Sequence, residues 1–293
     1  MDTQINEDIL HGYTFSYIND DVDVGTSGTS LDIDTYSISK YITFHQGEDK
    51  FVEGNIGLSK IDLKHIRKSD SNILHGDRDG HQIYGSINYI TSIKSNNFTI
   101  TPSVKLDISH TVLDDYSETG TNALNYKKQN IQTGALYTGI DFESFIEKNE
   151  ISFRPSFGME VGLDFSPTSD ADITYVSDPN TKYTRSIDQQ DASGSISGKT
   201  KIGFDIMLKT GLSLMNLYER NQSENSHSDT YYIGINYDPV RKEVKYTMLF
   251  NDNKASLEYF KKINGLNINF DTSYDLFSKI PYYEMSLKIS SKF

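Results

Sequence analysis

Apolar and polar residues alternate with a period of two along most of this chain. From Phe98 to Ser109, Pro102 and the apolar residues take the even positions, and polar residues take the odd ones. The segment from Ile151 to Phe165 repeats this pattern. Successive side chains of a strand point to opposite faces, so both segments predict strands with one apolar and one polar face. They exceed the strands of about 5–6 residues usual in soluble sheets and match the about 9–11 residues of a tilted membrane strand.

The same alternation predicts strands in the rest of the chain. Further clear segments are 202–208, 231–237, 244–250, 266–270 and 283–293, and weaker ones are 13–18, 36–44, 51–63, 82–93, 129–142 and 257–260. No run approaches the roughly 20 apolar residues that a membrane-spanning helix needs. The pattern therefore predicts an all-β protein, a transmembrane up-and-down antiparallel β-barrel with about thirteen or fourteen candidate strands.

The expected connections between these strands come in two sizes. Short ones, at 94–97, 147–150 and 238–241, contain the Asn, Asp, Pro and Ser residues that turns favour. Longer loops are expected at 20–30, 67–80, 112–123, 166–199 and 219–229. Alternating short and long connections are typical of an up-and-down barrel with short periplasmic turns and longer extracellular loops. A Greek-key sandwich does not produce this regularity.

Composition agrees with a barrel. The hydrophobic fraction is 36% and the mean hydropathy is −0.53, which suits strands that are only half apolar. The 20 Tyr and 15 Phe residues could form aromatic girdles at the membrane interfaces, or the core of a soluble sandwich. A net charge of −13 argues against nucleic acid as a partner. The absence of cysteine excludes disulfides and thiolate metal sites.

The chain ends on a strongly alternating segment. Termini of soluble proteins usually fray and carry polar residues, whereas a closing barrel strand presents apolar residues to lipid up to its end. The residues expected on the lipid-facing side of this last strand are Tyr283, Met285, Leu287, Ile289 and Phe293.

Charged residues of both signs occupy the polar positions of otherwise apolar strands. In a barrel these side chains face inward, where they either line a hydrated passage or pair with neighbours and fill a narrow interior. The candidates for lining the lumen are Lys105, Asp107, Arg154, Glu160, Asp164, Lys201 and Asp205.

Catalytic and cofactor signals are weak. The seven histidines show no metal-site spacing, and no P-loop, Rossmann or GxSxG pattern occurs. His75 and His81 flank the segment Gly76–Gly80, which could form a cation or catalytic cluster but is better interpreted as a solvated loop. We therefore expect no enzyme activity, no cofactor and no metal.

Several segments resemble the translocator domain, or β-domain, of bacterial autotransporters. They are the stretch Asp23–Gly28 leading into Tyr36–Tyr41, Arg67 after a long strand, Ile100–Pro102, the motif loop with Tyr116, Glu118 and Gly120 followed by Ala123 and Leu124, the segment Gly134–Ile140, and terminal Phe293. The similarity in order and spacing runs from about Leu10 to Phe165.

The resemblance implies a barrel of about 12 strands, within a range of about 10–14, in the outer membrane. This barrel takes part in secreting an N-terminal passenger of the same polypeptide, with a helix in the lumen. It also implies insertion by the barrel-assembly machinery, which recognises the last strand and its terminal aromatic residue. The partners would be outer-membrane lipid, this machinery, and the protein's own passenger and pore helix.

In the family, the passenger, the pore helix and the first strands precede the position of Gly12. Residues 1–8 are polar and contain no signal peptide. We therefore expect a short polar leader at 1–8, left from an upstream region, and an N-terminally truncated barrel domain at 9–293. Alternatives are a stand-alone porin or adhesin-like barrel, a barrel hydrolase or protease, and a soluble β protein.

Overall fold

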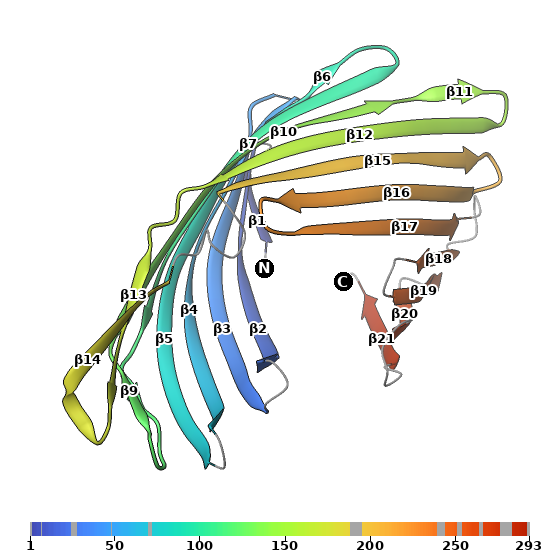
Figure 1. Ribbon diagram of the computed structural model, residues 1–293. Coiled ribbons are helices and arrows are strands. Elements are labelled where there is room, and N and C mark those ends of the chain that lie inside the picture. Colours follow the sequence, from blue (N-terminus) through green and yellow to red (C-terminus); the bar gives the residue numbers. More distant parts are fainter. Residues whose placement is uncertain are drawn as a thin grey trace.

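The computed structural model describes residues 2–6, 8–24, 28–47, 49–69, 72–187, 195–238, 244–250, 254–263, 266–275 and 283–291. Every regular element in these ranges is a β-strand, and the strands form one large curved sheet with a small sheet beside it (Figure 1). The described part of the chain contains no helix long and apolar enough to cross a membrane. The all-β antiparallel prediction is confirmed.

The main sheet contains 17 strands in the described ranges. Its long strands are β2 (Ile9–Val24), β3 (Thr29–His45), β4 (Lys50–Ser69), β5 (Asn72–Thr91), β7 (Phe98–Leu113), β10 (Gln129–Ser144), β12 (Ile151–Asp164), β15 (Ile196–Leu208), β16 (Leu212–Ser223), β17 (His227–Tyr237), β18 (Val244–Phe250), β19 (Lys254–Ile263), β20 (Leu266–Asp275) and β21 (Tyr283–Ser291). Its short strands are β1 (Asp2–Asn6), β6 (Ile93–Lys94) and β11 (Ile146–Lys148). The fourteen long strands stand at the upper end of the expected range.

Each long strand pairs antiparallel with the next long strand along the chain, from β2 to β21. This is the up-and-down order that the alternation of connections predicts. Residues directly opposite each other in neighbouring strands point to the same face of the sheet. The pairing register therefore tests whether the apolar positions of separate strands fall on one face.

The apolar positions do form continuous rows. Ile87, Leu106, Leu136, Leu163 and Ile196 stand opposite one another on five successive strands. We call the face with this row the apolar face. The adjacent row of Lys105, Tyr137, Gly162 and Ser197 belongs to the other face, which we call the polar face.

Large apolar side chains are exposed rather than buried. Phe15 is 76% exposed, Met285 73% and Ile87 52%, whereas the buried hydrophobic residues within the described ranges are only Leu74, Ala123 and Ala171. A soluble protein buries such side chains in a core, and a large exposed apolar surface marks a contact with another apolar phase. The burial pattern contradicts the soluble sandwich and fits strands whose apolar face meets lipid.

Aromatic rings stand near both edges of the apolar face. Near the short turns, Tyr237, Tyr246 and Tyr259 are directly opposite one another, with ring centroids 6.5 and 5.2 Å apart. Tyr17 and Tyr36, 5.1 Å apart, stand in the middle of β2 and β3, where the apolar positions of these strands give way to Asn19 and Asp34. Amphipathic rings favour membrane–water interfaces, so this placement is that of the expected girdles.

Three predicted loops are wrong. The hairpins β2–β3, β4–β5 and β16–β17 continue as paired strands through most of 20–30, 67–80 and 219–229. His75 and His81 therefore lie within β5 and not in a solvated loop. Beyond a membrane both strand faces can meet water, so alternation is lost while the backbone hydrogen bonds of the ladder persist. We call this end of the sheet the long-hairpin end.

The remaining long connections hold a second sheet. The segment 112–123 leads through β8 (Tyr116–Ser117), and the segment 166–199 contains β13 (Ser169–Tyr175) and β14 (Asp178–Ile187). With β9 (Leu124–Tyr126) these strands form a four-stranded sheet in the order β14-β13-β9-β8, beside the long-hairpin end of β5 (Figure 1). At the start of the chain, part of the expected polar leader forms β1, which pairs with β2.

Candidate functional site

All seven charged residues expected to line the lumen lie on the polar face. Asp107 and Asp164 are both opposite Ala135, Lys201 is opposite Gly158, and Asp205 is opposite Arg154. They come from β7 (Lys105, Asp107), β12 (Arg154, Glu160, Asp164) and β15 (Lys201, Asp205). β12 pairs with β15, and β10 lies between β7 and β12. The charges therefore form one continuous polar patch.

Part of this patch is paired. Lys105 Nζ lies 2.7 Å from Asp107 Oδ2, and Arg154 Nε lies 2.8 Å from Glu143 Oε1. Lys105, Asp107 and Glu160 also line a polar cleft of about 510 Å³ together with Tyr137 and Lys199. Because both ion pairs are substantially exposed, each contributes at most about 1 kcal/mol and leaves the charges hydrated.

The motif loop forms a hairpin fastened to the polar face of β4 and β5. This β8–β9 hairpin, residues 116–126, is held first by Glu118. Its fully buried carboxylate accepts hydrogen bonds from Arg67 Nε at 2.8 Å and Arg67 Nη2 at 2.6 Å. The backbone N–H of Leu124 donates a third at 2.9 Å. The two-pronged guanidinium contact fixes both distance and orientation.

Electrostatics at Glu118 favour the charged form. Burial alone would raise the pKa of Glu118, but the hydrogen bonds from Arg67 and from the Leu124 N–H hold it below its ordinary value. His65, whose Nδ1 lies 3.8 Å from Glu118 Oε1, has its pKa lowered mainly by burial. The Glu118 carboxylate is therefore ionised near neutral pH and satisfied chiefly by Arg67.

A second anchor is built on Tyr116. Its ring stacks on Tyr126 with centroids 4.7 Å apart and an interplanar angle of 5°. Gly76 lies beneath it, where a Cβ would come within 2.5 Å of the Tyr116 ring, so only glycine leaves room. The Arg78 guanidinium lies 5.4 Å from the Tyr116 ring centroid. This arrangement gives a cation–π contact on the same hairpin.

Arg78 also ties together the two ends of the connection. Its Nε donates to the Asp114 carbonyl at 2.7 Å and its Nη2 to the Lys127 carbonyl at 3.1 Å. Burial lowers the pKa of Arg78. These contacts fasten the segment before β8 and the segment after β9 to one strand of the barrel wall.

The tip of the hairpin is set by Gly120. Its φ is +126°, a conformation that side chains rarely adopt, and a Cβ there would lie 2.9 Å from Leu74. Beside it, the Thr119 N–H donates to the His75 carbonyl at 2.8 Å. The three residues of the motif loop thus have distinct positions: Tyr116 stacks, Glu118 pairs with Arg67, and Gly120 packs on fully buried Leu74.

The candidate assembly segment forms β21, which pairs with β20. Met285 and Leu287 stand opposite Thr272 and Phe270 and are 73% and 64% exposed. Tyr283 and Ile289 occupy positions of the same parity in the register. Phe293 lies outside the described residues.

No group of histidine and carboxylate side chains with metal-binding geometry occurs in the described ranges. His75 and His81 occupy odd positions of β5, on the same face as Ile83 and Ile87. They belong to the apolar face, so they do not join the charged patch.

An apolar face ringed by aromatic residues, a charged polar face and successive antiparallel strands define a membrane β-barrel. The chain belongs to the autotransporter family, because the model of the autotransporter beta-domain matches residues 1–219. It is thus an outer-membrane β-barrel domain of this family. This membership confirms the resemblance seen in the sequence.

Several solved outer-membrane proteins are similar to this chain at low sequence identity. The translocator domain of NalP from Neisseria meningitidis is 10% identical, with a TM-score of 0.38, over 98% of this chain and 89% of that chain. The transport unit of AIDA-I from Escherichia coli is 10% identical, with a TM-score of 0.42, over 99% and 92%. The ferric yersiniabactin uptake receptor FyuA from Yersinia pestis is 9% identical, with a TM-score of 0.49, over 95% and 50%.

The first matching structures are considerably longer than this chain, which spans 42% of the RagAB peptide importer chain and 50% of FyuA. No curated protein matches the sequence. Family membership follows from the sequence match to residues 1–219.

Proposed function

We propose that this barrel secretes an N-terminal passenger of its own polypeptide through its lumen. The observation that supports this most directly is the match of residues 1–219 to the autotransporter beta-domain. Lys105, Asp107, Arg154, Glu160, Asp164, Lys201 and Asp205 would hydrate the passage and contact the pore helix. The exposed ion pairs of this patch suit a passage better than a packed interior, because they leave the charges accessible to water.

The β8–β9 hairpin has a place in this proposal. It is attached to the polar face at the long-hairpin end, which in an up-and-down outer-membrane barrel is the extracellular end. We infer that it narrows the extracellular opening and that Arg67 and Arg78 keep it against the wall while the passenger crosses.

A passenger fusion tests the function. A signal peptide and an epitope-tagged segment are joined ahead of residue 1, and antibody binding to intact bacteria is measured. We expect the epitope to reach the surface when the barrel is present and to remain inside when the same segment is fused to an unrelated outer-membrane barrel. An epitope that stays in the periplasm while this barrel is folded in the outer membrane would contradict secretion and favour a stand-alone porin or adhesin-like barrel.

We further propose that β21 is the signal for the barrel-assembly machinery, with Phe293 at its end. Replacing Phe293 with serine should reduce the folded barrel severalfold, measured as the heat-modifiable band in outer-membrane fractions. Replacing Ser290 with alanine, at a position of the opposite parity in the same segment, is the matched control and should leave folding unchanged. Normal barrel levels in the Phe293→Ser variant would refute the signal.

A further inference from the structure

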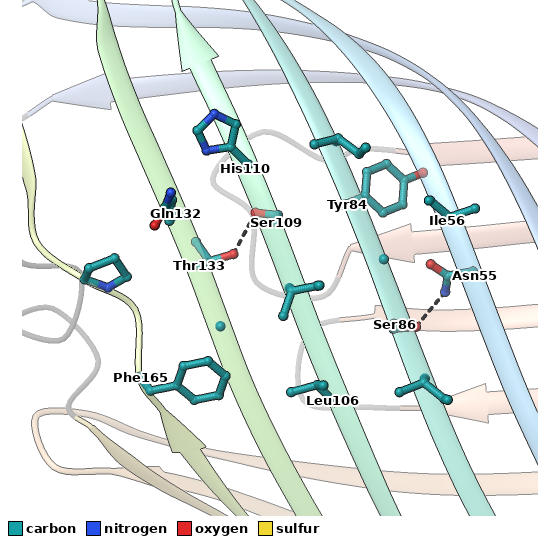
Figure 2. A pocket seen from close by; sticks show the side chains of 16 residues that line it. Asn55, Ile56, Tyr84, Ser86, Leu106, Ser109, His110, Gln132, Thr133 and Phe165 are labelled. Atoms are coloured by element: carbon teal, nitrogen blue, oxygen red, sulfur yellow. Dashed lines mark hydrogen bonds between the residues drawn. The ribbon is translucent and has the colours of Figure 1, made fainter.

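Two grooves lie side by side on the apolar face, near the end of the apolar band that faces the long hairpins. The first is lined on this face by Ile83, Ile87, Leu106, Ile108, Phe165 and Pro167 (Figure 2). The second is lined by Phe15, Tyr36, Ile38, Leu58, Lys60 and His81. Leu58 and Ile83 stand opposite each other on β4 and β5, so the grooves share a wall.

Glycines form part of the floor of the first groove. Gly85 is opposite Ile108, and Gly134 is opposite Ile108 on its other side. The ring of Phe165 lies against Gly134, where any Cβ would overlap it. The missing side chain at Gly85 therefore leaves an apolar depression beside Ile108, and the Phe165 ring covers Gly134 and forms a wall of the groove.

Polar side chains gather at one end of both grooves. Figure 2 shows His110 and Gln132 at the end of the first groove opposite to Leu106. In the second groove, Lys60 and His81 stand opposite each other. His110 is opposite Ile83, two residues along β5 from His81, so Lys60, His81 and His110 follow a diagonal across three strands.

Acidic residues beyond Lys60, His81 and His110 limit where an anionic group can bind. Asp34, Asp62 and Asp79 stand opposite one another in the next row towards the long hairpins. Lys60 Nζ contacts Asp62 Oδ1 at 2.7 Å, but this pair is exposed and can exchange partners at little cost. A phosphate at the row of Lys60 and His81 would therefore compete with Asp62 for Lys60, and it would be repelled one row farther out.

We propose that these grooves bind one phosphorylated, multiply acylated glycolipid of the outer leaflet. Its acyl chains would occupy the two apolar grooves, and a phosphate would accept hydrogen bonds from Lys60, His81 and His110. The inference rests on the orientation in the proposed function, with the long hairpins outside. A phospholipid of the inner leaflet would meet the other end of the apolar band, away from these donors.

Native mass spectrometry of the purified full chain in detergent tests the proposal. The probes are hexa-acylated diphosphoryl lipid A, the same lipid A without phosphates, and phosphatidylethanolamine. We expect the diphosphoryl form to bind about tenfold more tightly than the other two, an affinity difference that one or two charged hydrogen bonds can supply. Equal binding of the three lipids would overturn the proposal.

Two variants separate headgroup from chain recognition. Replacing Lys60, His81 and His110 together with glutamine should remove the preference for phosphate and leave binding of the other two lipids unchanged. Replacing Phe165 with alanine should weaken both lipid A forms by the same factor, because it removes one wall of the first groove. An unchanged phosphate preference in the triple variant would overturn the proposal.

Arg220→Gln is the matched control. Arg220 is an exposed cation on the apolar face of β16, paired with Asp229 and away from both grooves. Its replacement should not change lipid binding, and a loss as large as that of the triple variant would overturn the site. If passenger secretion fails while lipid A binding follows this pattern, the error lies in the proposed function and not in the lipid site.

Discussion

Replacing Arg67 with alanine should release the β8–β9 hairpin from the barrel wall. Glu118 is 3% exposed and would be left as a buried carboxylate without its guanidinium, a change that typically costs about 3–5 kcal/mol. Hydrogen exchange of residues 114–128 measures the release directly. We expect exchange to rise throughout this segment, while the strands of the apolar band remain protected.

Two variants control for this effect. Arg220→Ala removes an exposed ion pair and should change stability by at most about 1 kcal/mol. A double replacement of Arg67 and Glu118 by leucine removes both charges and should restore much of the protection, because no buried charge remains unpaired. Full protection of the hairpin in Arg67→Ala would show that the ion pair does not hold it.

The same contact has a defined pH dependence. Because the pKa of Glu118 is lowered in the folded protein, its contribution is fully present above its ordinary pKa of 4.5. The contribution is lost as the pH falls through the lowered folded value. Docking through Glu118 should therefore be insensitive to pH around neutrality and weaken only in strong acid.

Arginine at position 104 should destabilise the barrel in a bilayer by about 2–4 kcal/mol, because Val104 lies on the apolar face in the middle of β7. Val104 is 46% exposed, so lipid is its neighbour and an arginine there would have to be dehydrated. Urea unfolding of the protein in lipid vesicles, followed by loss of the heat-modifiable band, measures the change. Phe157→Arg, on the same face of β12, should act similarly.

The adjacent residue supplies the control. Ser103 precedes Val104 in β7 but belongs to the polar face, opposite Gly139. Ser103→Arg adds the same charge and volume on the hydrated side and should change stability by less than about 1 kcal/mol. Equal destabilisation by Ser103→Arg and Val104→Arg would mean that the two faces do not differ in environment.

The alternation of apolar and polar residues identified the fold. This pattern can be seen within each short segment, but it reflects the two different faces of the assembled sheet. The register from β5 to β15 places Ile87, Leu106, Leu136, Leu163 and Ile196 in one row, as their positions in five separate alternating segments require. A shift of one residue in any pair would turn an apolar strand face towards the polar side. The same reasoning placed Lys105 and Asp164 together on the opposite face.

Local sequence patterns gave wrong predictions where the strands extend beyond the apolar band. The segment Gly76–Gly80 has the glycine and aspartate residues of a loop, yet Gly76 and Gly80 are buried within β5. Gly76 is required by the ring of Tyr116, which lies 40 residues later in the chain. The role of Arg78, in the same segment, could not be predicted from the sequence. No neighbouring residue indicates that its hydrogen-bond acceptors are the carbonyls of Asp114 and Lys127.

The sequence by itself determined the strand order, the two faces of the sheet and the family. The strands and their faces follow from the alternation of apolar and polar side chains, and the family follows from the spacing of its motifs; both are properties of the linear sequence. Only the tertiary structure decided that Arg67 pairs with Glu118, that Arg78 fastens the β8–β9 hairpin, and that Lys60, His81 and His110 align beside two grooves. These contacts join residues from different strands, and their pairing follows from register and hairpin docking, which no local pattern encodes.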